Sequence, residues 1–312
     1  MKKMKVKSFL ILITIFFGMS LSSESTIYGK LWITVESQDT TSGTEVDLVS
    51  NASLLGITGN MYVREGLEAI YQAEYEVDPV DGTADEKNER TFKQRNSFVG
   101  IKGSYGSLFM GTHDTAFKIS QSKIDLFNDL AGDIENILQG ENRMKDFIGY
   151  TTPKFRGGIS ATFNIIKGTE GLGDDSINDS TSVSLNYKTK SLYAALSIDS
   201  KLKGYDSTRL SLQIPFNRTQ IGIIYQDTEN LGTGKEKDGY VVSVLKKVGS
   251  KGIFKFQIAH SDMKLNSGKQ TSIGYDYKLS KKATVLFFFT DLSGDEELNE
   301  KEVGAIGFEY RF

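Results

Sequence analysis

Apolar and polar residues alternate with a period of two along most of this sequence, and this alternation limits its possible folds more than any other feature. Near the C-terminus, Ile306, Phe308 and Tyr310 share one face with Phe312, whereas Glu309 lies on the other. Successive side chains of a β-strand point to opposite faces, while a helix repeats every 3.6 residues. The pattern therefore predicts an all-β protein.

Sixteen segments with this alternation, separated by turn-forming residues, are expected to be strands. They are residues 26–38, 46–58, 67–78, 91–102, 107–114, 143–152, 157–167, 180–188, 191–200, 206–214, 217–227, 238–246, 252–262, 269–278, 282–291 and 302–312. Strands of about ten residues with one apolar and one charged face are typical of a transmembrane barrel. A soluble β-sandwich has the same alternation. With this many charged residues on one face, however, a sandwich would have only a thin hydrophobic core. We therefore predict a sixteen-stranded antiparallel transmembrane β-barrel.

The connections between these segments support the barrel. Short connectors (103–106, 153–156, 215–218 and 248–251) alternate with longer polar ones (79–90, 168–180, 228–237 and 291–301). Outer-membrane barrels have short periplasmic turns and longer external loops. All three prolines, Pro79, Pro153 and Pro215, fall in connectors, as expected where strand N–H groups must pair.

The first 23 residues form a separate unit. Four lysines up to Lys7 precede an apolar run from Phe9 to Phe17, and small residues follow it. This order predicts a secretory signal peptide over residues 1–23, because the run is shorter than the ~20 residues that a spanning helix needs. Residues 24–312 are then the barrel domain. Removal of the four lysines leaves 33 basic and 40 acidic residues, a formal charge of −7.

One connector is much longer than the others. It comprises the 28 residues 115–142 between the fifth and sixth segments, and a connector of this length in a compact fold is usually functional or disordered. Disorder is not expected, because the connector contains Ile124, Leu126, Phe127, Leu130, Ile134, Ile137 and Leu138. The connector carries five acidic residues, which are Asp125, Asp129, Asp133, Glu135 and Glu141.

The composition argues against most enzyme chemistry. The chain has no cysteine and two histidines, His113 and His260, so thiol catalysis and cysteine metal sites are excluded and imidazole chemistry has few candidates. We expect no catalytic residues, no metal site and no cofactor. The slight excess of acidic residues argues against nucleic acid as a partner.

Five short stretches, taken together, resemble the general porins of Gram-negative bacteria, which are trimeric sixteen-stranded diffusion channels. The stretches are residues 27–31, 66–72, 95–103, 111–115 and 307–312, and they follow the family's order and spacing over the whole mature chain. The resemblance implies that the third external loop folds into the barrel and narrows the pore. It also implies that acidic residues of this loop face basic residues on the opposite wall.

The resemblance assigns roles to residues of this sequence. Residues 115–142 take the place of the constriction loop, and their five carboxylates become its acidic residues. Lys30 and Arg95 match basic wall residues of the family, and alternation adds Arg143 and Lys145 at the start of the sixth strand. The second strand reads Ser53-Leu54-Leu55-Gly56 where the family commonly has an arginine, so its basic row is thinned here. From these charges we predict a weak preference for cations that fades near molar salt.

The resemblance also implies partners and a location. Phe308, Tyr310 and Phe312 would form the signal that the barrel-insertion machinery reads. A homotrimer in the outer membrane of a Gram-negative bacterium, in contact with lipid and lipopolysaccharide, would pass ions and small hydrophilic solutes. The alternatives are a barrel selective for a sugar or another nutrient, an outer-membrane barrel enzyme and a secreted soluble β-protein.

Overall fold

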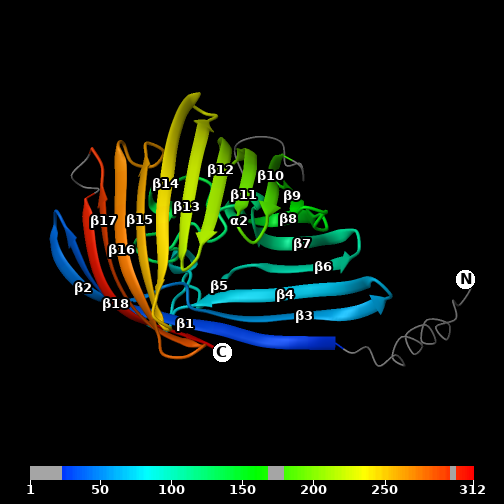
Figure 1. Cartoon of the computed structure of the whole chain (residues 1–312), viewed down its shortest axis with the longest axis horizontal. Helices are drawn as coiled ribbons and strands as arrows, with labels where there is room; N and C mark the ends of the chain where they lie inside the picture. The colour runs from blue at the N-terminus through cyan, green and yellow to red at the C-terminus, as the bar shows by residue number, and fades with distance from the viewer. Residues whose placement is uncertain (1–22, 168–178, 296–299) are drawn as a thin grey trace, which may run out of the picture.

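A computed structural model describes residues 23–167, 179–295 and 300–312 of the chain, and its strands surround a common interior (Figure 1). The predicted signal peptide, residues 1–23, lies outside these described residues except for Ser23. Within the described residues, no helix is long and apolar enough to cross a membrane.

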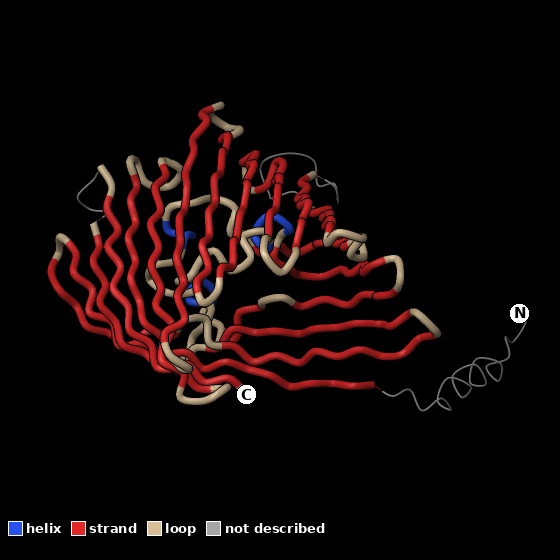
Figure 2. Tube along the Cα trace, viewed as in Figure 1, coloured by secondary structure: helices blue, strands red, loops and turns tan. Residues whose placement is uncertain are grey.

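The described residues form a sheet of eighteen strand segments, and Figure 2 shows the strands in red. They are β1 (Ser23–Thr40), β2 (Gly43–Ser50), β3 (Leu54–Arg64), β4 (Leu67–Val77), β5 (Phe92–Gln94), β6 (Ser97–Gly103), β7 (Gly106–Asp114), β8 (Arg143–Thr151), β9 (Ile159–Ile166), β10 (Ser180–Lys188), β11 (Tyr193–Leu202), β12 (Tyr205–Phe216), β13 (Thr219–Asn230), β14 (Lys235–Val248), β15 (Gly252–Ser261), β16 (Gly268–Lys278), β17 (Ala283–Ser293) and β18 (Lys301–Arg311). Short helical turns occur at η1 (Glu86–Asn88), α2 (Ala116–Ile119) and η2 (Ile134–Asn136).

These segments form sixteen strands, because two of the strands are interrupted. β2 and β3 both pair with β1, and β5 and β6 both pair with β4. At the first break, the backbone N–H of Trp32 donates to Ser53 Oγ at 2.9 Å, so a side chain replaces the missing ladder bond. Each strand pairs antiparallel with the next, and β18 returns to β1 with Phe308 opposite Ile33. The predicted closed barrel of sixteen antiparallel strands is confirmed.

The two faces of the sheet differ as the alternation predicts. On β1, Leu31 and Val35 are exposed on one face, whereas Lys30 and Thr34 are buried on the other. On β12, Leu210 is exposed beside the buried Arg209. An outward apolar face and an inward polar face are the arrangement of a barrel in lipid, where a closed sheet leaves no unpaired edge.

Three details of the strand assignment differ from prediction. The polar residues 228–237 are mostly strand, since Thr228 pairs with Lys237 and only 231–234 turn the chain. The connector after β17 is likewise shorter than residues 291–301, because β17 continues to Ser293. Pro215 lies within β12 because pairing with β11 ends at Gln213, so a missing N–H costs no ladder bond on that side.

Candidate functional site

Residues 115–142, hereafter the inner segment, are held in shape by their own polar side chains. The Thr115 hydroxyl accepts from the Lys118 N–H at 3.1 Å and caps α2. Asp133 caps η2 by accepting from the Glu135 N–H at 2.7 Å. Such caps satisfy the N–H groups that a helical turn leaves free. The same caps explain why so polar a segment is folded.

Apolar side chains attach the inner segment to the inward face of several strands. Ile124, Ile134 and Leu138 are fully buried against Ile224 of β13 and Val241 of β14. A second cluster joins the segment to strands nearer the C-terminus, and its members are Phe127, Leu130, Leu286, Phe288 and Val303, with Trp32 packed against it. Full burial of one such side chain is worth about 1.5–3 kcal/mol. The inner segment is therefore packed in place.

Neutral polar side chains on the strands bind the backbone of the inner segment. The first contact is Ala116 N–H to Asn164 Oδ1 at 2.6 Å, and further along Ser243 Oγ donates to the Ile124 carbonyl at 2.6 Å. Gln257 accepts from the Leu126 N–H at 2.9 Å and donates to Asp125. These contacts extend from β9 to β15. Hydroxyls and amides can satisfy a buried backbone without leaving a buried charge.

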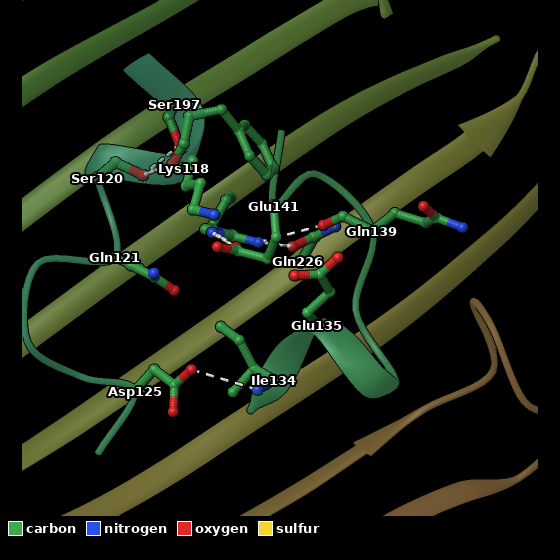
Figure 3. A network of polar contacts seen from close by, with 12 residues as sticks. Lys118, Ser120, Gln121, Asp125, Ile134, Glu135, Gln139, Glu141, Ser197 and Gln226 are labelled. Carbon is green, nitrogen blue, oxygen red and sulfur yellow. Dashed lines mark hydrogen bonds and ion pairs between the residues drawn. The ribbon is translucent and has the colours of Figure 1, made fainter. Parts of the chain in front are cut away.

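One buried ion pair fixes the end of the inner segment (Figure 3). Arg209 of β12 donates to Glu141 at 2.8 Å, and their side chains are 0% and 3% exposed. Arg209 also donates to Gln226 Oε1 and to the Gln139 carbonyl, and its guanidinium lies 4.3 Å from the Phe117 ring centroid. With both charges paired and hydrogen-bonded, the desolvation cost of burying them is offset.

The five carboxylates predicted to line a constriction have different surroundings. Asp125 is 9% exposed and accepts from two backbone N–H groups of the segment and from Gln257. Asp133 accepts from the N–H groups of Asp129 and Glu135. Burial raises the pKa of Asp125 to about 6 and raises that of Asp133 as well. Only part of the charge counted from the sequence is therefore free to act on an ion.

The other three carboxylates each have different surroundings. Asp129 forms an ion pair with Lys30 at 3.3 Å and belongs to the lining of a cavity. The Glu135 side chain is exposed, and its backbone carbonyl accepts from Lys264. Glu141 is the buried partner of Arg209. The structure thus brings Asp129, but not Asp125 or Glu141, to an open space.

Of the four predicted basic residues, three form ion pairs and one is exposed. Lys30 is buried against Asp129, and Arg95 pairs with Glu74 at 3.2 Å and with Glu76 at 2.8 Å. Arg143 pairs with Asp114 at 3.1 Å. Lys145 is exposed and lines neither of the two cavities described next.

The placement of Lys145 has a local cause. The pairing of β7 with β8 shifts register between Gly111 and His113, so one extra residue is accommodated on β8 between Met144 and Phe147. A bulge of this kind interrupts the alternation of faces. The face on which Lys145 lies therefore does not follow from the face on which Arg143 lies. Its role in the pore wall stays a prediction.

Two adjoining cavities lie beside the inner segment. The first, of about 650 Å³, is lined by residues of β3, β4, β6 and β7, including Glu68 and Lys102. The second, of about 480 Å³, lies between the inner segment and residues that include Arg95 and Arg143. They share Asp114 and Ile119, so together they form an open space along one side of the segment.

The two histidines occupy strand positions. His113 packs edge-on against Phe98 and lies beside Phe147, while its Nδ1 contacts the Asp114 carbonyl at 2.8 Å. His260 Nδ1 contacts the Gly268 carbonyl at 2.9 Å. Among the described residues, no group of three or more histidine, aspartate or glutamate side chains is placed to hold a metal ion.

The C-terminal aromatic residues lie on the outer face. Phe308, Tyr310 and Phe312 are between 41% and 45% exposed. Phe312 exchanges both backbone hydrogen bonds with Gly29 of β1, and a Cβ on Gly29 would lie 2.3 Å from the Phe312 ring. The last residue therefore belongs to the closure of the barrel. Its part in an insertion signal stays a prediction.

Five basic residues of this region are not among those that the sequence predicts, namely Arg209 and, in the lining of the second cavity, Lys118, Lys123, Lys154 and Lys188. Arg209 had a signal, because alternation places it on the face opposite the exposed Leu210. Lys118 and Lys123 line the second cavity, but they lie in an irregular segment where no periodicity assigns a direction.

Known proteins resemble the chain in both sequence and structure. Residues 15–297 match the family described as Gram-negative porin. The major outer membrane protein P.IA of Neisseria meningitidis is 30% identical over 108 residues, which are 34% of this chain and 26% of that protein. The match thus spans about a quarter of the curated relative.

Solved structures show the same fold. An anion-selective porin from Comamonas acidovorans aligns with a TM-score of 0.77 and 20% identity, covering 93% of this chain and 100% of that one. OmpF of Salmonella typhi, in complex with daunomycin, aligns with a TM-score of 0.74 and 16% identity over 92% and 97% of the two chains. The family match, extending over most of the barrel described above, shows that this outer-membrane chain belongs to the Gram-negative porin family.

Proposed function

We propose that this chain forms a water-filled channel through which ions and small hydrophilic solutes diffuse passively across the outer membrane. One observation carries the proposal. Within a closed barrel, the inner segment packs against one part of the wall and leaves two adjoining cavities, which charged and neutral side chains line. A barrel of this strand number is wide enough for an aqueous passage, and such a passage needs no catalytic group.

In this proposal the inner segment is the third external loop, and it narrows the channel. Its support is the set of contacts from Ala116 to Glu141 that attach it to β9, β12 and β15. Because these contacts are buried, the narrow passage would keep a fixed shape. The predicted weak cation preference rests on five carboxylates facing the passage, and Asp125 and Glu141 are instead buried in hydrogen-bonded contacts.

The proposal extends to assembly and chemistry. We expect a homotrimer that contacts outer-membrane lipid and lipopolysaccharide, as the resemblance to trimeric diffusion porins implies, and that needs the barrel-insertion machinery. We expect no enzymatic activity, since passage through a polar constriction requires charge and size only.

The test is reconstitution of the mature protein, purified in detergent, into planar bilayers. Stepwise conductance in groups of three is the expected result, and a heat-unfolded sample of the same preparation is the control. A preparation that is folded by circular dichroism and still gives no conductance would contradict the proposal.

A further inference from the structure

The second cavity is strongly basic, although the chain as a whole is acidic. Among the described residues, six basic side chains and two carboxylates line it, which gives this part of the lining a formal charge of +4. The carboxylates are Asp114 and Asp129, and the basic residues are Arg95, Lys118, Lys123, Arg143, Lys154 and Lys188. A narrow passage with this lining would attract anions, whereas the net negative charge of the sequence suggests a preference for cations.

Ion pairs neutralise some of these groups but leave the excess unchanged. Arg143 pairs with Asp114, and Arg95 pairs with Glu74 and Glu76 just behind the lining. Asp129 is taken by Lys30. The four lysines of the lining form no ion pair within 4.0 Å with any described residue. The unbalanced charge is therefore that of the lysines.

The two lysines of the inner segment are held by their backbones. The Lys118 N–H donates to Thr115 in α2. The Lys123 N–H donates to Gln213 at 3.3 Å, and its carbonyl accepts from Gln220 at 2.8 Å. The wall thus fixes the main chain of Lys123 while its exposed side chain lines the cavity.

The acidic groups of the inner segment do not cancel these lysines. Asp125 and Asp133 accept hydrogen bonds from the segment's own backbone, and Glu141 is paired with Arg209. Other acidic side chains gather in a separate cavity at the barrel end with the longer connectors, where Asp39, Asp291, Glu300 and Glu302 lie. Charges in that separate cavity are screened by salt over about 10 Å at 0.1 M ionic strength.

From this charge distribution, we infer that the narrow part of the channel prefers anions and that Lys118 and Lys123 set this preference. The inference rests on the proposed channel function and names its solute class, which is small inorganic and carboxylate anions. Both lysines belong to the segment that the sequence presents as acidic.

The size of the effect can be estimated from the separation of charges. At about 8 Å and 0.1 M ionic strength, each unpaired lysine would raise the local concentration of anions about 1.5-fold and lower that of cations by the same factor. The ratio of chloride to potassium then changes about 2-fold per lysine, and four charges at this distance set its upper limit at about 25. At 1 M salt, where the screening length is about 3 Å, the ratio should approach 1.

The experiment measures the zero-current potential across a KCl gradient for the wild-type mature protein and for the double variant Lys118→Gln/Lys123→Gln. We expect chloride preference in the wild type and a chloride-to-potassium permeability ratio about 5-fold lower in the variant. The matched control is Lys281→Gln, since Lys281 is exposed in the turn between β16 and β17 and lines none of the cavities described above. Potassium acetate in place of KCl tests the carboxylate class.

Each outcome decides a different statement. Conductance with potassium preference in the wild type would overturn the inference and leave the proposed channel intact. Chloride preference that the double variant keeps undiminished would also overturn it, because the selectivity would then arise elsewhere. A folded barrel without conductance would overturn the channel function and the inference together.

Discussion

The two sides of the barrel interior use their polar residues differently. From β10 to β16, inward positions are largely serine and glutamine, such as Ser182, Ser243 and Gln257, and the inner segment packs on them. From β3 to β8 they include charged residues such as Glu68 and Lys102, and the first cavity lies there, while the lining of the second extends to Lys188 of β10. The first region is hereafter the packed side and the second the open side.

This difference shows how one wall can both hold a segment and conduct ions. Neutral hydroxyls and amides lose little when they exchange water for a backbone partner, whereas an unpaired buried charge costs several kcal/mol. Two charged pairs on the packed side follow this rule, Arg209 with Glu141 and Lys255 with Asp276, whereas the buried Asp199 of β11 forms no ion pair with a described residue. A charge acts on a passing ion only where water can reach it.

Removal of Arg209 should have the largest effect on the packed side. In Arg209→Ala, Glu141 stays buried without its partner and the guanidinium contact with Phe117 is lost. Breaking a buried pair costs about 3–5 kcal/mol, so we expect the inner segment to loosen while the barrel stays closed. Single-channel recording should show higher conductance and more current noise.

The double variant Arg209→Met/Glu141→Leu is the control for Arg209→Ala. It removes both charges and keeps similar volume, and such replacements are often neutral. We expect quiet channels of nearly wild-type conductance. If the double variant were as noisy as Arg209→Ala, the effect would come from lost packing and not from an unpaired charge.

Two adjacent phenylalanines of β17 test whether packing on the inner face alone holds the segment. Phe288 is 5% exposed, with its ring centroid 6.4 Å from that of Phe127, whereas Phe289 is 42% exposed on the outer face. Phe288→Ala should weaken the segment by about 3 kcal/mol, and Phe289→Ala should leave it unchanged. Trp32 is the single tryptophan and packs against the same cluster, so its emission should shift to the red only in Phe288→Ala.

Acidic solution should stabilise the packing of the inner segment. Because burial raises the pKa of Asp125 to about 6 from 3.8, the packed form holds more protons than the released form between about pH 4 and pH 6. The free energy of release therefore falls as pH rises through this window, by about 1–3 kcal/mol. Trp32 emission followed in urea, below concentrations that unfold the barrel, should show release at lower urea at pH 7.5 than at pH 4.5.

The variant Asp125→Asn controls for other titrating groups. It cannot ionise at position 125, so the dependence of release on pH should become flatter, with Asp133 supplying what remains. Release that is easier at pH 4.5 than at pH 7.5 in the wild type would contradict the sign assigned to Asp125.

The sequence predicts the barrel well because alternation acts at every strand. The outward positions of Leu31, Leu210 and Phe308 follow from a period of two, and so does the inward position of Arg209. The direction of a side chain can no longer be predicted where the alternation ends. The bulge before Phe147 changes parity at Lys145, and the irregular inner segment has no repeat that could say which of its side chains face the wall.

The inner segment shows the same limit in its charges. Counted along the sequence it is acidic, but Asp125 and Asp133 are used to hold its own turns, and Lys123 lines the cavity. Contacts with strands more than 80 residues away in the sequence, such as those with Gln213 and Gln257, decide how the side chains of the segment are used. They determine which carboxylates cap a turn and which lysines are exposed to water. The net charge of the segment therefore does not predict whether the channel prefers anions or cations.

The smallest expected effect separates two lysines that line the second cavity. Lys123 lies on the packed backbone of the inner segment, whereas Lys154 lies in the exposed connector between β8 and β9. A charge on the segment acts across a short span of water, whereas one in an exposed connector is surrounded by water and is screened more fully. Lys123→Gln should therefore lower the chloride-to-potassium permeability ratio about 2-fold and Lys154→Gln by less, as zero-current potentials at 0.1 M KCl would measure. Equal shifts would mean that the whole lining of the second cavity, and not the inner segment, sets the selectivity.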